Sequence, residues 1–187
     1  MIKIFIDQGH NPQNPNSGAE GNGYREQDLV YEIGVRTAEL LRQNGNFDVR
    51  LSRPTPDTQL GTSNASSLRE RVDAANAWGA DWFISLHANA SEIESATGTE
   101  GFVYNVNSAA YPLALDIVRS VSEATGEPDR GVTARPTLYV LRRTAMPATL
   151  IELGFITNYN EAQMMAQSPG LYARGVYNGI LDFFGFS

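Results

Sequence analysis

The sequence predicts an α/β domain in which a mostly parallel central sheet is covered by helices on both faces. Short apolar runs that are typical of buried strands alternate along the chain with longer segments of helical periodicity. The chain has 187 residues, of which 42% are hydrophobic, and this is enough for one good core. We therefore expect a single domain over residues 1–187.

The first fifty residues are predicted to run strand, loop, helix, strand. Ile2 to Ile6 is a nearly continuous apolar run, which suits a strand that is buried on both faces. The loop that follows, residues 8–23, is rich in Asn, Pro and Gly. From about Tyr24 apolar residues recur with helical spacing until Asn44-Gly45, which is a stop signal. Residues 49–51 are predicted as the second strand.

The middle of the chain is predicted to add a loop, a helix and a third buried strand. Residues 54–66 are polar and turn-forming, which favours a loop. The pattern from Leu68 to Trp78 indicates a helix that ends at Gly79. The apolar run from 82 to 86 then predicts the strand.

The rest of the chain is predicted to contribute three more strands and three more helices. The strands are expected at 101–106, 138–141 and 148–151. The helices are expected at 112–125 and, as two segments, between about 161 and 184.

Composition excludes several classes of function. A net charge of −7 and scattered basic residues argue against nucleic acid as a partner. The absence of cysteine excludes thiolate chemistry, so any metal must be held by histidine and carboxylate. No run approaches the roughly 20 apolar residues of a membrane span, and the first residues lack the pattern of a signal peptide. Gly21-Asn22-Gly23 does not sit in a tight turn between strand and helix, so a dinucleotide site is not indicated.

The only two histidines, His10 and His87, each follow a predicted buried strand. The predicted strand at 148–151 likewise brings Glu152, the residue that follows it, to the same edge of the sheet. The carboxyl ends of strands are where α/β proteins collect their functional groups. A carboxylate within an apolar run costs several kcal/mol to desolvate unless it is paired or near a metal. Imidazole and carboxylate together are a ligand set typical of catalytic zinc, which takes three protein ligands.

The residues alone leave alternatives open. The third ligand is undecided among four carboxylates: Glu20, Glu26, Asp28 and Glu152. Taken singly, a histidine at a strand end is more often a hydrogen-bonded structural residue than a metal ligand, and Glu152 is equally explained as a helix cap or as an arginine partner. A serine hydrolase is disfavoured because no G-x-S-x-G elbow is present, and because Ser85 and His87 would project side by side from one strand.

Four motifs stand in order along the chain: Asp7-Gln8-Gly9-His10, Gly23-Tyr24-Arg25-Glu26, Ser85-Leu86-His87-Ala88-Asn89 and Ile151-Glu152-Leu153-Gly154-Phe155. In order and spacing they resemble the motifs of the type 3 family of N-acetylmuramoyl-L-alanine amidases. Further similarity lies in 68–72, 130–132 and 138–148, so the resemblance spans essentially the whole chain. It implies a three-layer fold of the phosphorylase/hydrolase type, with a twisted, mixed sheet of about six strands flanked by about five or six helices.

The resemblance also implies an activity and its residues. His10, Glu26 and His87 would bind one zinc ion, and Glu152 would be the catalytic carboxylate. The reaction would be hydrolysis of the amide bond between N-acetylmuramic acid and the L-alanine of the peptidoglycan stem peptide. Glu152 would accept a proton from the zinc-activated water and pass it to the departing amine.

Three further residues are candidate substrate contacts: Asn89, Arg130 and Arg142. The two arginines lie in predicted loops near strand ends and would suit peptide carboxylates, although solvated arginines explain them equally well. One departure from the family pattern is Asn11-Pro12, where a second glycine usually follows the first histidine, and it changes the rim of the groove.

Two other functions remain alternatives at this stage, namely a zinc hydrolase of a different peptide or amide bond and a zinc-bound, inactive peptidoglycan-binding module. Intact Glu152 disfavours the second. We expect the protein to act as a monomer on the bacterial cell wall, as a phage-type endolysin or an excised catalytic domain. An activator and a separate wall-binding domain are candidate partners.

Overall fold

The computed structural model describes residues 1–186 and contains two sheets and six helices within that range. The strands are β1 (Ile2–Gln8), β2 (Glu20–Gly21), β3 (Tyr24–Arg25), β4 (Phe47–Leu51), β5 (Trp82–Asn89), β6 (Thr99–Val103), β7 (Asp129–Ala134) and β8 (Ala148–Phe155). The helices are α1 (Glu26–Asn44), α2 (Asn64–Trp78), α3 (Ala110–Thr125), α4 (Tyr139–Arg143), α5 (Tyr159–Gln167) and α6 (Pro169–Phe184).

The main sheet has six strands in the order β4-β1-β5-β8-β6-β7, and β2 and β3 form a separate small hairpin. Neighbouring strands of the main sheet are parallel except β6 and β8, which are antiparallel. The expected α/β fold with a mixed, mostly parallel sheet of about six strands is therefore confirmed. Because β1, β5 and β8 are adjacent and parallel, their carboxyl ends meet at one edge.

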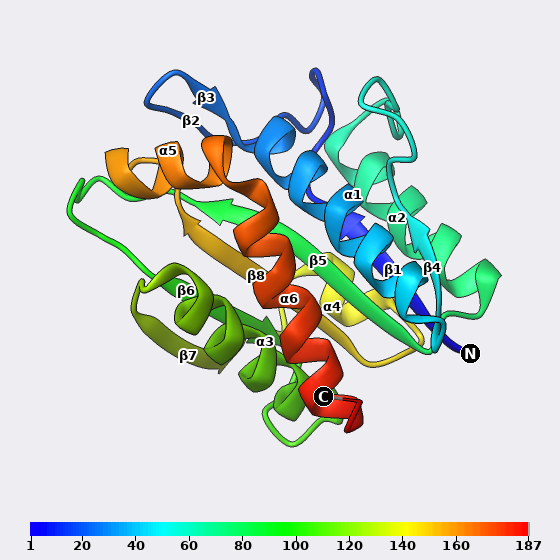
Figure 1. Ribbon diagram of the computed structural model, residues 1–187. Helices are drawn as coiled ribbons and strands as arrows, with labels where there is room; N and C mark the ends of the chain where they lie inside the picture. Colours follow the sequence, from blue (N-terminus) through cyan, green and yellow to red (C-terminus); the bar gives the residue numbers. More distant parts are fainter. Residues whose placement is uncertain (187) are drawn as a thin grey trace.

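Helices cover both faces of the sheet. Figure 1 shows α1, α6 and α3 in front of the sheet and α4 behind it. The larger core joins one set of alternate strand residues, such as Ile4, Ile84 and Ile151, to α1, α3 and α6. A smaller core joins the other set, such as Phe83 and Leu150, to α2 and α4. Since side chains alternate along a strand, His87 and Glu152 share the face of this smaller core.

The predicted strand at 138–141 is wrong, because Tyr139–Arg143 is the short helix α4. A run of four apolar residues fits a buried helical turn as well as a strand, and here Val140 and Leu141 pack into the smaller core. The sixth strand is instead β7, which the sequence did not indicate. It is an edge strand whose residues are mostly exposed, so it carries no apolar run.

Several boundaries differ from the prediction. Strands β5 and β8 extend to Asn89 and Phe155, so His87 and Glu152 lie within strands and not beyond their ends. Helix α2 begins four residues before Leu68, because Ser63 and Ser66 form a capping box. The first turn of the helix is polar, so the sequence assigned it to the preceding loop. Its predicted end is confirmed, since Gly79 closes the helix with a left-handed φ of 66°.

The predicted loop at 8–23 contains the hairpin of β2 and β3. Asn22 and Gly23 turn the hairpin with φ angles of 53° and 83°, as asparagine and glycine commonly do in tight hairpin turns. Within residues 1–186, every helix is too short or too polar to cross a membrane.

Candidate metal centre

His10, Glu26 and His87 meet at the edge formed by the ends of β1 and β5. His10 follows β1, Glu26 is the first residue of α1, and His87 lies in β5. One nitrogen or oxygen atom from each side chain lies within 4.8 Å of the others. Glu26 Oε1 is 3.1 Å from His10 Nε2 and 3.0 Å from His87 Nδ1. The chain thus brings a carboxylate oxygen between two imidazole rings.

Arg71 of α2 holds the backbone that carries His10. Its guanidinium is 1% exposed and donates hydrogen bonds to the carbonyl oxygens of Gln8 at 2.6 Å and His10 at 2.5 Å. It also pairs with Asp7 Oδ1 at 2.7 Å, and Asp7 Oδ2 accepts a hydrogen bond from Ser85. His10 has a φ of 68°, which is unusual for a residue with a side chain, and these bonds stabilise it.

The loop after His10 is fixed in the same way. The Asn11 side-chain amide donates to the carbonyl oxygens of Pro15 and Leu60, each at 2.8 Å. Its Oδ1 accepts from the backbone of Leu60 at 3.1 Å and from Arg71 at 3.2 Å. Asn11 is fully buried, and these hydrogen bonds hold the Asn/Pro-rich loop against the molecule.

The hairpin and the residues before it fix Glu26. The backbone N–H of Ala19 donates to Glu26 Oε2 at 2.9 Å, and that of Ala88 donates to Oε1 at 3.0 Å. Glu26 returns a backbone hydrogen bond to Ala19. Gly18 packs so closely that a Cβ there would lie 2.7 Å from Glu26 Oε2. The carboxylate thus has little freedom to leave the two histidines.

The donor set fits a divalent metal ion. Burial alone raises the pKa of Glu26, but hydrogen bonds with the His10 and His87 rings outweigh burial, so its pKa falls below the ordinary value. The carboxylate therefore stays ionised. Two imidazole nitrogens and one carboxylate oxygen at this spacing match the three protein ligands of a catalytic zinc site.

Of the four carboxylates that the residues alone left open, only Glu26 joins the cluster formed within residues 1–186. Glu20 is exposed on the hairpin, and Asp28 is exposed and paired with Arg25 Nε at 2.9 Å. Glu152 lies opposite His87 on the neighbouring strand. No pattern in the sequence distinguishes Glu26 from Glu20 or Asp28, because the choice depends on the backbone N–H groups of Ala19 and Ala88 that hold the Glu26 carboxylate in the fold.

Glu152 is a half-buried carboxyl group beside the cluster. Its Oε2 has no hydrogen-bond partner among residues 1–186. Burial, with the negative charges of Glu26 and Glu100, raises the pKa of Glu152 to about 8, although Arg135 opposes the shift. A carboxyl group with a free oxygen and a pKa near neutrality is suited to exchange a proton with a substrate or with water.

The three candidate substrate contacts lie outside the cluster of His10, Glu26 and His87. Asn89 ends β5 and donates from Nδ2 to Glu100 Oε1 at 2.6 Å. Arg130 lies in strand β7 and Arg142 in helix α4, and not in the loops that the sequence suggested. Arg130 donates to the carbonyl oxygen of Thr97 at 3.1 Å, and Arg142 is exposed.

Sequence reasoning gave no role to three residues near the site: Arg71, Glu100 and Arg135. A signal for Arg71 was present, since it lies three residues after Leu68 and four before Ala75, on the apolar side of α2. Glu100 pairs with Glu152 across β6 and β8. Arg135 lies over the Phe102 ring, with its Cζ 4.7 Å from the ring centroid. Arg135 directly follows β7, and because the sequence did not predict this strand, it gave no reason to place Arg135 near the site.

Known proteins resemble this chain over its whole length. The family model described as N-acetylmuramoyl-L-alanine amidase matches residues 4–182. The amidase CwlM of Bacillus licheniformis is 37% identical over 191 residues, covering 100% of this chain and 70% of that protein. A sporulation-specific N-acetylmuramoyl-L-alanine amidase of Bacillus subtilis is 36% identical over 188 residues, covering 98% and 69%.

The fold also matches solved structures of such enzymes. The catalytic domain of CwlV, an N-acetylmuramoyl-L-alanine amidase from Bacillus (Paenibacillus) polymyxa, superposes with a TM-score of 0.86 at 30% identity, covering 100% of both chains. An N-acetylmuramoyl-L-alanine amidase from Clostridium difficile gives the same TM-score and identity over 98% of this chain and 97% of the other.

Proposed function

The chain belongs to the N-acetylmuramoyl-L-alanine amidase family of cell-wall enzymes, and from that premise we propose that it is a zinc enzyme. Its substrate is peptidoglycan, and the bond it hydrolyses joins N-acetylmuramic acid to L-alanine. The observation that carries the proposal is the cluster of His10, Glu26 and His87, with Glu152 beside it, whose Oε2 has no hydrogen-bond partner among residues 1–186. In this proposal residues 1–187 form one catalytic domain.

His10, Glu26 and His87 would hold the ion. Zinc bound in such a site supplies Lewis-acid chemistry, polarising a carbonyl group and allowing water to react near neutral pH. The chain provides a rigid frame for it, because Arg71 fixes the His10 backbone and two backbone N–H groups fix the Glu26 carboxylate. Ligands that are held in this way are poised before the ion arrives.

Glu152 would move the proton. In its ionised form the carboxylate accepts a proton at Oε2 from the attacking water, and it then delivers this proton to the amine of the departing L-alanine. A pKa of about 8 without metal makes Glu152 a competent acid, and a nearby divalent cation favours its ionised form. The same group therefore serves as base and then as acid.

The test is digestion of purified peptidoglycan by the wild type, Glu152→Gln and His87→Ala, with assays of newly exposed N-terminal L-alanine and of bound zinc. Glu152→Gln should retain zinc and lose on the order of a hundredfold or more of the rate, because proton transfer is removed. His87→Ala should lose both zinc and activity. Glu20→Gln is the matched control, since Glu20 is exposed and outside the cluster, and it should behave as the wild type. Loss of zinc in Glu152→Gln would contradict this division of roles.

A further inference from the structure

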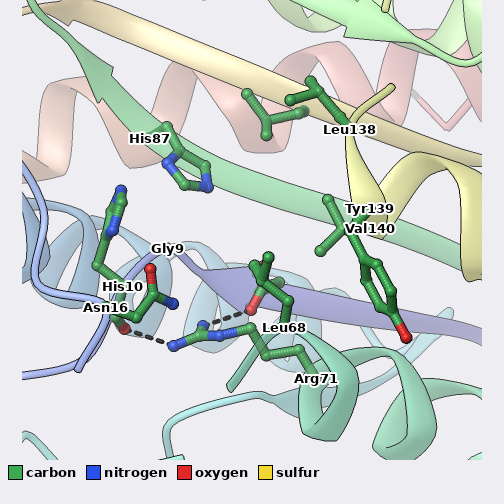
Figure 2. Close-up of a pocket in the computed structure, with 11 residues that line it drawn as sticks. Gly9, His10, Asn16, Leu68, Arg71, His87, Leu138, Tyr139 and Val140 are labelled. Carbon is green, nitrogen blue, oxygen red and sulfur yellow. Dashed lines mark hydrogen bonds and ion pairs between the residues drawn. The ribbon is translucent and has the colours of Figure 1, made fainter. Parts of the chain in front are cut away.

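A small cavity adjoins the two histidines, and Glu26 is not among the residues that line it. Figure 2 shows His10 and His87 on one side of it and Leu138 and Val140 on the other, with Leu68 and Arg71 of α2 below. Its volume is about 120 Å³. The apolar wall is formed by Leu68 of α2, Leu138 just before α4, Val140 of α4 and Leu150 of β8.

The charged groups in the wall of this cavity are already paired. Asp7 Oδ1 accepts from Arg71 Nη1 at 2.7 Å, and Asp7 Oδ2 accepts from Ser85 Oγ at 2.7 Å. Arg71 Nη2 is occupied by the carbonyl oxygen of His10 and by Asn11. Asp7 and both terminal nitrogens of Arg71 are thus engaged, and among residues 1–186 only Nε of this guanidinium has no partner. The apolar side chains that make up most of the rest of the wall favour an apolar group.

The volume limits how large that group can be. An engineered protein cavity of about 150 Å³ is able to hold benzene. A cavity of about 120 Å³ suits a smaller group, such as a methyl or a short branched chain. Because His10 and His87 form part of its wall, such a group would lie close to the bond that is cleaved.

We propose that this cavity is a subsite for a methyl group next to the scissile amide, and this rests on the proposed function. Both sides of that amide carry a methyl group, one on the lactyl carbon of muramic acid and one on the α-carbon of L-alanine. The chemistry that the cavity recognises is the same for both. Leu68, Leu138 and Val140 are then residues that determine specificity for the reaction.

Three soluble substrates distinguish the two methyl groups. They are an N-acetylmuramoyl-L-alanyl peptide, the same compound with glycine in place of alanine, and the same compound with a glycolyl in place of the lactyl group. Removing the methyl group that occupies the cavity should lower kcat/KM about tenfold or more. The glycine compound reports on the alanine methyl, and the glycolyl compound reports on the lactyl methyl.

Variants of Leu138 test whether this cavity is responsible. Leu138→Trp should fill the cavity, lower kcat/KM for the full substrate about tenfold, and reduce the discrimination against the methyl-free compound to less than about threefold. Leu115→Trp is the matched control, because Leu115 is an exposed leucine on α3, and it should keep the wild-type discrimination. Leu138→Ala should enlarge the cavity. The ratio of kcat/KM for a substrate with an ethyl group in place of the recognised methyl to kcat/KM for the full substrate should therefore be higher in this variant than in the wild type.

The outcomes separate this proposal from the function on which it rests. If the wild type cleaves the full substrate but removal of either methyl group leaves kcat/KM unchanged, the subsite is wrong and the amidase function stands. Equal loss on all three substrates in Leu138→Trp, with unchanged zinc content and thermal stability, would also overturn it. If the wild type holds zinc but cleaves none of the three substrates, the proposed amidase function is wrong, and the subsite proposal that rests on it is wrong as well.

Discussion

The buried pair of Asp7 and Arg71 connects the smaller core to the candidate metal centre. Both side chains are 1% exposed, and Arg71 also donates to the backbone of His10. Burial alone raises the pKa of Asp7, but the Arg71 guanidinium and the hydrogen bond from Ser85 outweigh burial, so its pKa lies below the ordinary value of 3.8. The folded state thus binds the Asp7 proton more weakly than the unfolded chain does.

This difference predicts how Asp7→Asn changes stability with pH. At neutral pH the substitution should cost about 3–5 kcal/mol, because it leaves the buried Arg71 charge without its partner. The pair's contribution is fully present above pH 3.8 and is lost as the pH falls through the lower folded pKa, so the wild type and variant should converge in acid. Urea unfolding of the metal-free proteins at pH 7 and at a series of pH values that descends from 3.8 measures this.

The control for that experiment is Asp28→Asn. Asp28 is paired with Arg25 on the surface, so its loss should cost less than about 1 kcal/mol. An Asp7→Asn penalty that is as small as this, or that grows as the pH falls below 4, would contradict the interpretation of Asp7 as an ionised partner of Arg71.

Single residues also show how far the candidate site could be predicted. His10, His87 and Glu152 were predictable because adjacent parallel strands bring their carboxyl ends together, and the sequence marks those strands by apolar runs. That Glu26 lies beside the two histidines was expected only from the family resemblance. Its position depends on the N–H groups of Ala19 and Ala88, which the hairpin and β5 supply and no local pattern reveals.

At the scale of elements, long apolar patterns were reliable and short or exposed ones were not. Helices α1 and α3 were predicted within two residues of their ends, because each presents a long apolar side to the larger core. The four-residue run at 138–141 was ambiguous and forms α4, whereas β7 is exposed and gave no signal.

Helix α2 begins in a polar segment, and its start depends on one capping residue. The Ser63 side chain accepts a hydrogen bond from the backbone N–H of Ser66 at 3.1 Å, and Ser66 Oγ accepts from the backbone N–H of Ser63 at 2.9 Å. Ser63→Ala should therefore lower the free energy of unfolding by about 1 kcal/mol. Ser63→Asp should restore most of that loss, because aspartate caps as well as serine.

Chemical unfolding of the variants measures the effect of the cap. Thr62→Ala is the matched control, since Thr62 is the exposed neighbour that precedes the cap, and it should unfold as the wild type does. If Ser63→Ala and Thr62→Ala are equally stable, the capping box does not set the start of α2.

At the scale of the whole molecule, the candidate ligands tie distant parts of the chain together. His10 follows β1, Glu26 opens α1 and His87 lies in β5, so the cluster exists only when the sheet and α1 are assembled. An ion that binds this cluster binds the folded state and not the unfolded chain. Metal binding is therefore linked to the stability of the entire fold.

Zinc should stabilise the metal-free protein by an amount that follows its free concentration. At a hundred times the dissociation constant the gain should be about 2.7 kcal/mol, and each further tenfold increase should add about 1.4 kcal/mol. His87→Ala should show little or no gain, because it removes one of three ligands. Mg²⁺ is the control ion for the wild type, since it prefers oxygen ligands and should stabilise far less. Urea unfolding across a zinc titration measures these differences, and an equal gain in wild type and His87→Ala would mean that zinc binds elsewhere.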